Sequence, residues 1–316
     1  MVNFAVFLPI GPGQNEIDRA ADLLDSIRFY EPQIPWLVFV DDAQEDRQLV
    51  KKFSLPKNCT AVSLVNPRRG GGVGDRGGLC VANMVAFSWI HEYTDASFVL
   101  KMDSDALVIS PFAQKIQQAF EISPEVGIIG SAHKLSCNGE KRNVFNDGYS
   151  MRKLHSPFAV WREPLKPGQH IQVSLWGKLK TIRTHVREAI NQGYCFGEHC
   201  QGGAYAVSIQ LIRRMAVRGY LQDPMLWVDV PCCEDVMMGM YARAVGLQLK
   251  DFNDKNNIFG IQHVGLADTP NGMLERGYSV IHSIKNDPNF SEEQIRTFYR
   301  QRRAVLVHHG VKNTFT

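Results

Sequence analysis

The chain has 316 residues, with 35 Lys plus Arg against 32 Asp plus Glu and a formal net charge of +3. Hydrophobic residues make up 44% and charged residues 21%, which are globular values that exclude disordered, collagen-like and supercharged proteins. The length allows one large α/β domain or two average ones. The small net charge gives no electrostatic case for a nucleic-acid partner.

The cysteine count and the hydropathy indicate a cytoplasmic protein. Seven cysteines form an odd set without the spacing of a disulfide framework, so we expect reduced thiols. The first residues lack the basic region and cleavage site of a signal peptide. The longest apolar runs, such as 4–10 and 82–90, are too short for a transmembrane segment. We therefore expect any membrane contact to be peripheral.

Strand and helix patterns alternate through the first 130 residues. We expect strands at 4–10, 36–40, 61–65, 97–102 and 126–129, and helices at 17–27 and 79–93. A further helix is expected to open at Ser110-Pro111, with Ser at the N-cap and Pro at the first helical position. This alternation indicates a mostly parallel sheet covered on both faces, in which ligands bind beyond the carboxyl ends of the strands.

The periodicity fades from His133 to Cys200, and we interpret this polar, aromatic and basic stretch as an insertion rather than a second core. Regular structure is expected to resume at 203–207. The chain ends in a helix with a capping box formed by Ser291 and Gln294. Its last turns carry arginines, the charge that the helix dipole favours there.

Asp103-Ser104-Asp105 follows an apolar strand, at the edge where ligands are expected. Two carboxylates separated by one small residue can converge on a hard cation, and oxygen ligands suit Mg²⁺ or Mn²⁺. Such an ion can hold phosphate oxygens and offset the charge of a leaving group. A polar turn is the alternative interpretation, but the second acidic strand end at Asp41-Asp42 favours a site.

Glu234-Asp235 opens an apolar helical stretch that Gly246 ends. An acidic pair in the first turn of a helix has a purely structural explanation, because the helix dipole stabilises carboxylates there. The functional interpretation is a general base that points into the cleft. The residues alone leave both open.

Together these segments resemble a glycosyltransferase of the GT-A fold, in the nucleotide-diphospho-sugar transferase superfamily. The resemblance rests on four pieces in the expected order, which are 6–10 with 38–42, the D-x-D strand 98–105, the glycine-rich segment 201–208, and the E-D-V-x-x-G helix start at 234–239. The last piece is similar to the beta-1,3-galactosyltransferase and Fringe-like branch. Members of that branch are usually membrane-tethered and disulfide-bearing, and this chain shows neither sign, which favours a soluble bacterial-type relative.

The resemblance implies a single GT-A catalytic domain over 1–316. Within it, 1–132 would be the nucleotide-sugar-binding half, 133–200 an irregular acceptor-side insertion, and 201–316 the acceptor and catalytic half with the basic C-terminal helix. The partners implied are a nucleotide-diphospho-sugar donor of the UDP-sugar type and a glycan or lipid-linked glycan acceptor.

The resemblance also assigns residues to the donor. Asp103 and Asp105 would hold Mn²⁺ or Mg²⁺ and, with Ser104, the donor diphosphate, while Asp42 would lie near the base or ribose. The donor-binding set is completed by Pro9, Asp41, Arg76 and Lys285. In the inverting branch the Asp of the E-D pair deprotonates the acceptor hydroxyl, so Asp235, with Glu234 beside it, is the predicted base.

The family often supplies a C-terminal histidine as a further metal ligand. His282 and His263 are both candidates, and we prefer His282 because Lys285 follows it closely and can meet a phosphate. The alternative for each is an ordinary, half-buried histidine.

A glycine-rich segment at 70–78 contains a G-x-G-x-x-G string. A dinucleotide-binding fingerprint should follow the first strand, and this one follows the third, which disfavours an NAD(P) oxidoreductase. Arg68, Arg69 or Arg76 in this loop can meet phosphate, and a plain surface loop is the alternative. The main alternative to the enzyme hypothesis is a non-catalytic sugar- or nucleotide-binding protein of the same fold.

Two further features stay open. Cys195, His199 and Cys200 lie close together in the sequence, but their spacing matches no usual zinc site, so free thiols are the favoured interpretation. The basic C-terminal helix is either a solvated face or a contact with an anionic acceptor or membrane surface.

Overall fold

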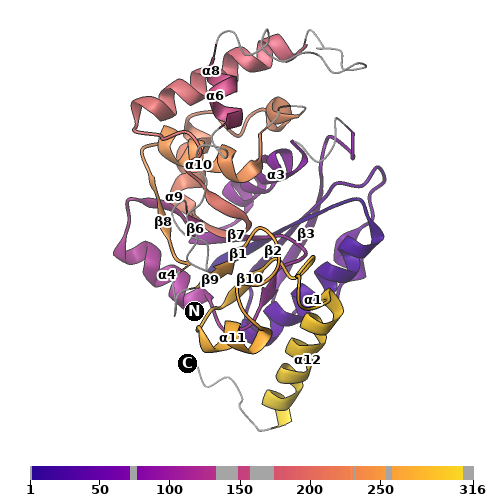
Figure 1. Cartoon of the computed structure of the whole chain (residues 1–316). Helices are drawn as coiled ribbons and strands as arrows, with labels where there is room; N and C mark the ends of the chain where they lie inside the picture. The colour runs from indigo at the N-terminus through magenta and orange to yellow at the C-terminus, as the bar shows by residue number, and fades with distance from the viewer. Residues whose placement is uncertain are drawn as a thin grey trace.

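The computed structural model describes residues 2–71, 77–132, 149–156, 174–228, 230, 232–253 and 258–308. Its centre is a seven-stranded sheet in the order β3-β2-β1-β4-β7-β6-β8 (Figure 1). The strands are β1 (Phe4–Ile10), β2 (Trp36–Asp41), β3 (Thr60–Val65), β4 (Phe98–Met102), β6 (Val126–Ala132), β7 (Cys200–Ser208) and β8 (Gln248–Asp251). Strand β7 pairs antiparallel with β4 and β6, and every other neighbouring pair in this sheet is parallel. The predicted mostly parallel α/β sheet is thereby confirmed.

Helices cover both faces of this sheet. They are α1 (Gln14–Tyr30), α2 (Leu49–Lys52), α3 (Gly78–Tyr93), α4 (Ala113–Ile122), α6 (Tyr149–His155), α8 (Ser174–Asn191), α9 (Ile209–Val217) and α10 (Glu234–Ala244), with a 3₁₀ turn η1 at Pro224–Trp227. Two further helices, α11 (Pro270–Glu275) and α12 (Glu292–His308), pack with a smaller sheet. Successive strand residues alternate between two cores, as period-two geometry requires. Phe7 belongs to the core that includes residues of α3, α8, α9 and α10, whereas Leu8 belongs to the core that includes residues of α1 and α4.

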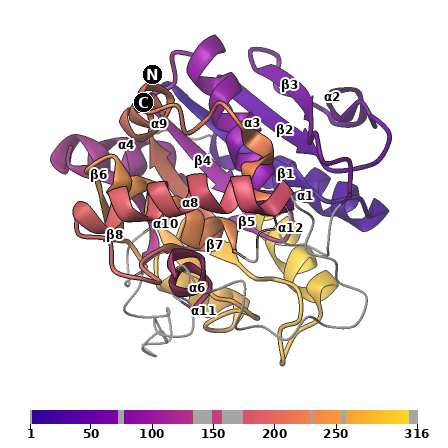
Figure 2. The same ribbon diagram turned by 90° about the horizontal axis from the view of Figure 1, so that it is seen from above.

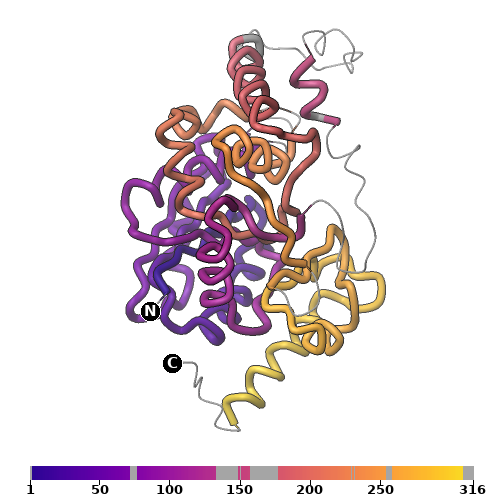
Figure 3. The backbone as a smooth tube through the Cα atoms, turned by 90° about the vertical axis from the view of Figure 1, so that its left-hand side faces the viewer, coloured from indigo at the N-terminus to yellow at the C-terminus, as the bar shows by residue number. Residues whose placement is uncertain are grey.

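A second, three-stranded sheet lies beside the carboxyl end of β4. It has the order β5-β10-β9, from Leu107–Val108, Val280–His282 and Phe259–Ile261. Its core includes Ile281 and Tyr278 and also Ile295 and Tyr299 of α12. The tube view separates this C-terminal part from α8, which lies at the opposite end of the molecule (Figure 3). The small sheet therefore brings residues near 280 to the end of β4.

The expected irregular insertion at 133–200 is wrong for its last third, because α8 is an 18-residue helix. Residues 133–148 and 157–173 lie outside the described residues. Four apolar residues at helical spacing face the core from α8, and they are Leu179, Ile182, Val186 and Ala189. Helix α8 lies across α10 (Figure 2), so this segment belongs to the main core.

The predicted start of a helix at Ser110-Pro111 is also wrong. Helix α4 begins at Ala113, and its first free N–H groups are capped from a distance. The carboxylate of Glu31 accepts from the backbone N of Phe112 at 2.6 Å and of Ala113 at 2.8 Å. Ser110 instead donates through Oγ to the carbonyl of Tyr278. A tertiary contact has replaced the local cap.

The capping box of the last helix is confirmed. The backbone N of Ser291 donates to Gln294 Oε1 at 2.8 Å, and the backbone N of Gln294 donates to Ser291 Oγ at 3.2 Å. These reciprocal bonds fix the start of α12.

The six described cysteines, which exclude Cys137, are free thiols. Within the described parts of the chain, no helix has both the length and the apolar character to cross a bilayer.

Candidate functional site

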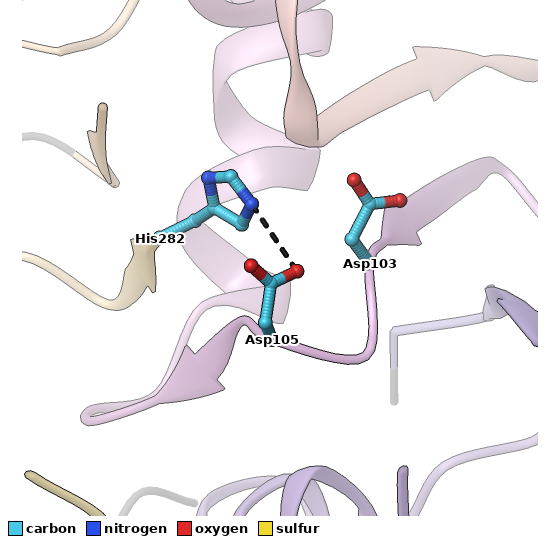
Figure 4. A group of neighbouring side chains, drawn as sticks. All are labelled: Asp103, Asp105 and His282. Carbon is cyan, nitrogen blue, oxygen red and sulfur yellow. Dashed lines mark ion pairs between the residues drawn. The ribbon is translucent and has the colours of Figure 1, made fainter. Parts of the chain in front are cut away.

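Three side chains meet at the carboxyl end of β4. Asp103 and Asp105 follow that strand, and His282 ends β10. One ligand atom from each lies within 4.8 Å of the other two, with the side chains turned toward one another (Figure 4). The antiparallel register of β5 and β10, with Ile281 opposite Leu107, carries His282 to Asp105. In the described part of the chain this is the one such group of His, Cys, Asp and Glu.

Asp105 is the buried member of the group, with 1% of its surface exposed. Its carboxylate lies 3.3 Å from His282 Nε2 and 3.1 Å from Lys285 Nζ, and accepts from Ser283 Oγ at 2.8 Å. Burial works to raise the pKa of Asp105, but His282, Lys285 and Ser283 outweigh it and hold that pKa well below its usual range. Asp105 is therefore ionised at neutral pH.

His282 presents one defined nitrogen to the group. Its Nδ1 lies 2.9 Å from the carbonyl oxygen of Gln262, which can only accept, so Nδ1 carries a hydrogen. Its Nε2 faces Asp105. Burial works to lower the pKa of His282, but the hydrogen bond to Asp105 and the charges of Asp105 and Asp103 raise it. Nε2 is thus the atom that can take a proton or a metal ion.

The donor set fits a divalent cation. Two carboxylates and one imidazole suit Mn²⁺, and the carboxylate oxygens also suit Mg²⁺. A histidine that binds a metal usually has its other ring nitrogen hydrogen-bonded, as Nδ1 of His282 is to the carbonyl oxygen of Gln262. Lys285, with 43% of its side chain exposed, stands beside Asp105.

A buried lysine links this group to the acidic pair of α10. Lys101 Nζ lies 2.6 Å from Asp103 Oδ1 and 3.0 Å from Glu234 Oε1, and it also donates to the carbonyl of Gly202. The lysine side chain is fully buried. Burial works to lower the pKa of Lys101, but Asp103 and Glu234 reverse this and raise it, so the ammonium stays charged. Sequence reasoning missed Lys101; its signal is a lysine within an apolar strand, two residues before an aspartate and on the same face.

Glu234 and Asp235 have different surroundings. Glu234 is buried against Lys101, and burial raises its pKa although the lysine charge works against that rise. Asp235 accepts from the backbone N of Gly202 at 3.1 Å and of Val236 at 2.7 Å. His199 Nε2 lies 3.4 Å from Asp235 Oδ2. Glu234 is therefore buried in an ion pair with Lys101, whereas 15% of the Asp235 side chain remains exposed to solvent.

His199 has its hydrogen fixed by a carbonyl. Its Nδ1 is 2.8 Å from the carbonyl oxygen of Gly197, so Nδ1 carries a hydrogen and Nε2 is left for Asp235. Sequence reasoning treated His199 only as a partner of nearby cysteines. Cys195 is exposed and Cys200 is buried, and neither joins a group of metal-ligating atoms within the described residues.

Two glycines of β7 leave room for these side chains. A Cβ at Gly202 would lie 2.6 Å from Glu234 Oε1, and a Cβ at Gly203 would overlap the imidazole of His282. Neither glycine has a positive φ, so space and not backbone conformation requires them. The glycine-rich segment thus exists because Glu234 and His282 pack against its backbone.

The other predicted donor residues are already engaged within the protein. Arg47 Nε donates to Asp41 at 3.0 Å, and Arg68 Nε donates to Asp42 at 2.9 Å. Ser104 is buried, and its Oγ donates to the carboxylate of Glu16.

Two described residues of the predicted set, Pro9 and His263, do not join these contacts. Pro9 is buried in β1 beside Val40. Arg76 lies outside the described residues, and His263 is exposed and lies apart from the Asp103 group.

Solved structures of glycosyltransferases are among those similar to this chain. No family model and no curated protein matches the chain. The apo WbbM bifunctional glycosyltransferase is similar with a TM-score of 0.48 and 12% identity, over 96% of this chain and 50% of that one. The galactosyltransferase LgtC with donor and acceptor sugar analogs gives 0.47 and 10%, over 94% and 95%. Apo mouse xyloside xylosyltransferase 1 gives 0.45 and 11%, over 91% and 99%.

This chain thus spans half the length of the WbbM structure and nearly all of the other two. The three neighbours are glycosyltransferases, the class that the sequence resemblance indicates. Because each TM-score is below 0.5, we interpret the site from its own residues.

Proposed function

We propose that this protein is a metal-dependent glycosyltransferase that moves a sugar from a nucleotide-diphosphate donor to a hydroxyl acceptor. The observation that carries the proposal is the convergence of Asp103, Asp105 and His282 at the carboxyl end of β4. That edge of a parallel sheet is where ligands bind in α/β proteins. A D-x-D pair completed by a histidine is a composition suited to a diphosphate-bound cation.

On the donor side, Asp103, Asp105 and His282 Nε2 would hold Mn²⁺ or Mg²⁺, which would offset the charge of the departing diphosphate. Lys285 can add a direct contact to a phosphate oxygen, because its ammonium stands at the metal group and is half-exposed. Lys101 keeps one oxygen of Asp103 occupied, which leaves the other for the ion. We assign the donor to the UDP-sugar class from the sequence resemblance.

On the acceptor side, Asp235 would take the proton of the attacking hydroxyl. It is the more exposed carboxylate of the acidic pair, and His199 beside it can share the proton it receives. Direct attack opposite the diphosphate inverts the anomeric centre. The acceptor would be a glycan or lipid-linked glycan that meets segment 133–200, and we place the enzyme in the cytoplasm, in keeping with its free thiols.

The first test is hydrolysis and transfer across a panel of sugar nucleotides, with Mn²⁺ and with chelator. We expect one donor to turn over only with the metal, and Asp105→Ala to lower turnover at least about 100-fold. Asp235→Asn should lower the rate of transfer by roughly 10²- to 10⁴-fold while donor binding is kept. Lys51→Gln, at an exposed position of α2, is the control.

Three results would contradict the proposal in different ways. Donor binding without turnover, unaffected by Asp235→Asn, would indicate a sugar- or nucleotide-binding protein. Fluorescence changes with NAD(P)H and none with sugar nucleotides would indicate an oxidoreductase. Retention of anomeric configuration in the product would keep the transferase but remove the role of Asp235 as base.

A further inference from the structure

We propose a second ligand site, for a phosphate group, on the side of the molecule opposite the metal group. The site is a surface hollow of about 440 Å³ between the end of α1, the last turns of α12 and the loop before β3. Seven residues line it, and they are Asp25, Arg28, Phe29, Pro32, Pro56, Lys57 and Arg303.

The hollow is remote from the donor site. Pro32 and Pro56 precede β2 and β3, whereas Asp41 ends β2 and Asp103 follows β4, so the two sites lie at opposite edges of a parallel sheet. Helix α1 spans that distance. Glu16 in its first turn bonds Ser104 beside the metal group, and Arg28 near its end lines the hollow, about 18 Å further along the helix.

The charge of the hollow favours an anion. Three of its lining residues are cations, and Asp25 is the one carboxylate among them. Arg28 holds Asp25 only at 3.3 Å, and both of those side chains are well exposed. Lys57 is exposed at the rim. The local balance is therefore two positive charges, which raises the local concentration of anions.

Arg303 supplies the observation that points to a ligand. It is 92% buried, since 8% of its surface is exposed, and its Nη1 has no hydrogen-bond partner among the described residues. Its ion pair is a 3.3 Å contact to Asp22. Arg296 and Arg300 hold that same carboxylate at 2.7 and 3.0 Å. Three arginines therefore share the single carboxylate of Asp22, which leaves the charge of the buried Arg303 poorly compensated, and an anion in the hollow would offset that charge.

The shape and walls indicate the class of anion. Phe29 and the two prolines add an apolar wall next to the cations. A dianionic phosphate, free or as the monoester of a small apolar group, combines a charge for Arg303, Arg28 and Lys57 with a surface for this wall. Arginine forks match phosphate oxygens in geometry as well as in charge.

The experiment is isothermal titration of the full chain with inorganic phosphate and with phenyl phosphate, in the presence of chelator so that no metal occupies the donor site. We expect saturable binding at one site. The double variant R28Q/K57Q should weaken it at least 10-fold, and added salt should weaken it too. Both substituted positions are solvent-accessible, so this variant is expected to fold.

The matched control is K51Q/K52Q, which removes the same two charges at exposed positions outside the hollow and should change the affinity less than twofold. Arg303→Lys keeps the charge but loses the fork, and should weaken binding less than Arg303→Gln. Phenyl phosphate binding at least fivefold tighter than phosphate identifies a monoester, whereas equal affinities identify free phosphate. Absence of saturable binding, or an affinity of R28Q/K57Q within twofold of the original, would overturn the proposal.

Discussion

The carboxyl ends of β2 and β4 look alike in sequence and differ in the folded protein. Each follows an apolar strand with two aspartates, at the edge of the sheet where ligands bind. At the end of β2, Arg47 and Arg68 neutralise Asp41 and Asp42 one to one. At the end of β4, the aspartates meet His282, whose Nε2 can exchange a proton for a metal ion. A carboxylate at a strand end becomes a candidate ligand only where its partner can be displaced.

The largest effect is expected from removing one charge at the end of β2. Asp41→Asn leaves Arg47 without its carboxylate in a half-buried place, so the free energy of unfolding should fall by about 3 kcal/mol. Mn²⁺ affinity should stay unchanged. Denaturant unfolding and a Mn²⁺ titration by electron paramagnetic resonance measure the two effects. If Asp41→Asn weakened Mn²⁺ binding as much as Asp105→Asn does, the two ends would form one site.

A smaller effect is expected from filling the space beside His282. In Gly203→Ala the new methyl group overlaps the imidazole, so His282 must move and Mn²⁺ affinity should fall by roughly 10-fold. Gly177→Ala in α8 is the matched control, because a Cβ there meets no atom within 4 Å. Equal Mn²⁺ affinities in the two variants would remove His282 from the ligand set.

The smallest effect concerns how stability depends on pH through Asp22, a carboxylate that is paired with arginines as Asp41 is paired with Arg47. Burial works to raise the pKa of Asp22, but Arg296 and Arg300 lower it below its usual value. A lowered pKa stabilises the fold above the ordinary value near 3.8 and loses that effect as pH falls further. We expect stability to be flat from pH 7 to 5 and to drop by roughly 1 kcal/mol per pH unit below 4.

Chemical denaturation of the original chain and of Asp22→Asn across that range measures this contribution. Asp22→Asn should be less stable at pH 7 and should show a shallower acid loss. A variant with the same acid slope as the original would place the sensitivity in other carboxyl groups.

Patterns among residues close in the sequence predicted most of the strands and several of the helices. Apolar runs located the strands of the first half, and the capping box located the start of α12, because both depend on residues close in sequence. The register of α8 was also readable, since Leu179, Ile182 and Val186 are spaced as one helix face, but the polar flanks obscured it. The D-x-D pair stood out because its two carboxylates are neighbours in the chain.

What could not be predicted depends on contacts between distant residues. The cap that Glu31 gives to α4, the arginines on Asp41 and Asp42, and the lysine between Asp103 and Glu234 are all set by tertiary packing. The basic last helix is the clearest case. The sequence left its arginines either on a solvated face or in contact with an anionic partner, but Arg296 and Arg303 are buried and pair with Asp22. Charge counted along a sequence does not tell which side chains reach solvent.

The antiparallel strand β7 has a consequence for how the protein is made. It sits between β4 and β6, yet it is translated long after both, and its glycines must be in place before Glu234 and His282 can pack. The metal group therefore cannot exist on a nascent chain until residue 282 has left the ribosome and docked. Such late, non-local pairing slows folding. Binding of Mn²⁺ during refolding would therefore report a late step of folding rather than the first one.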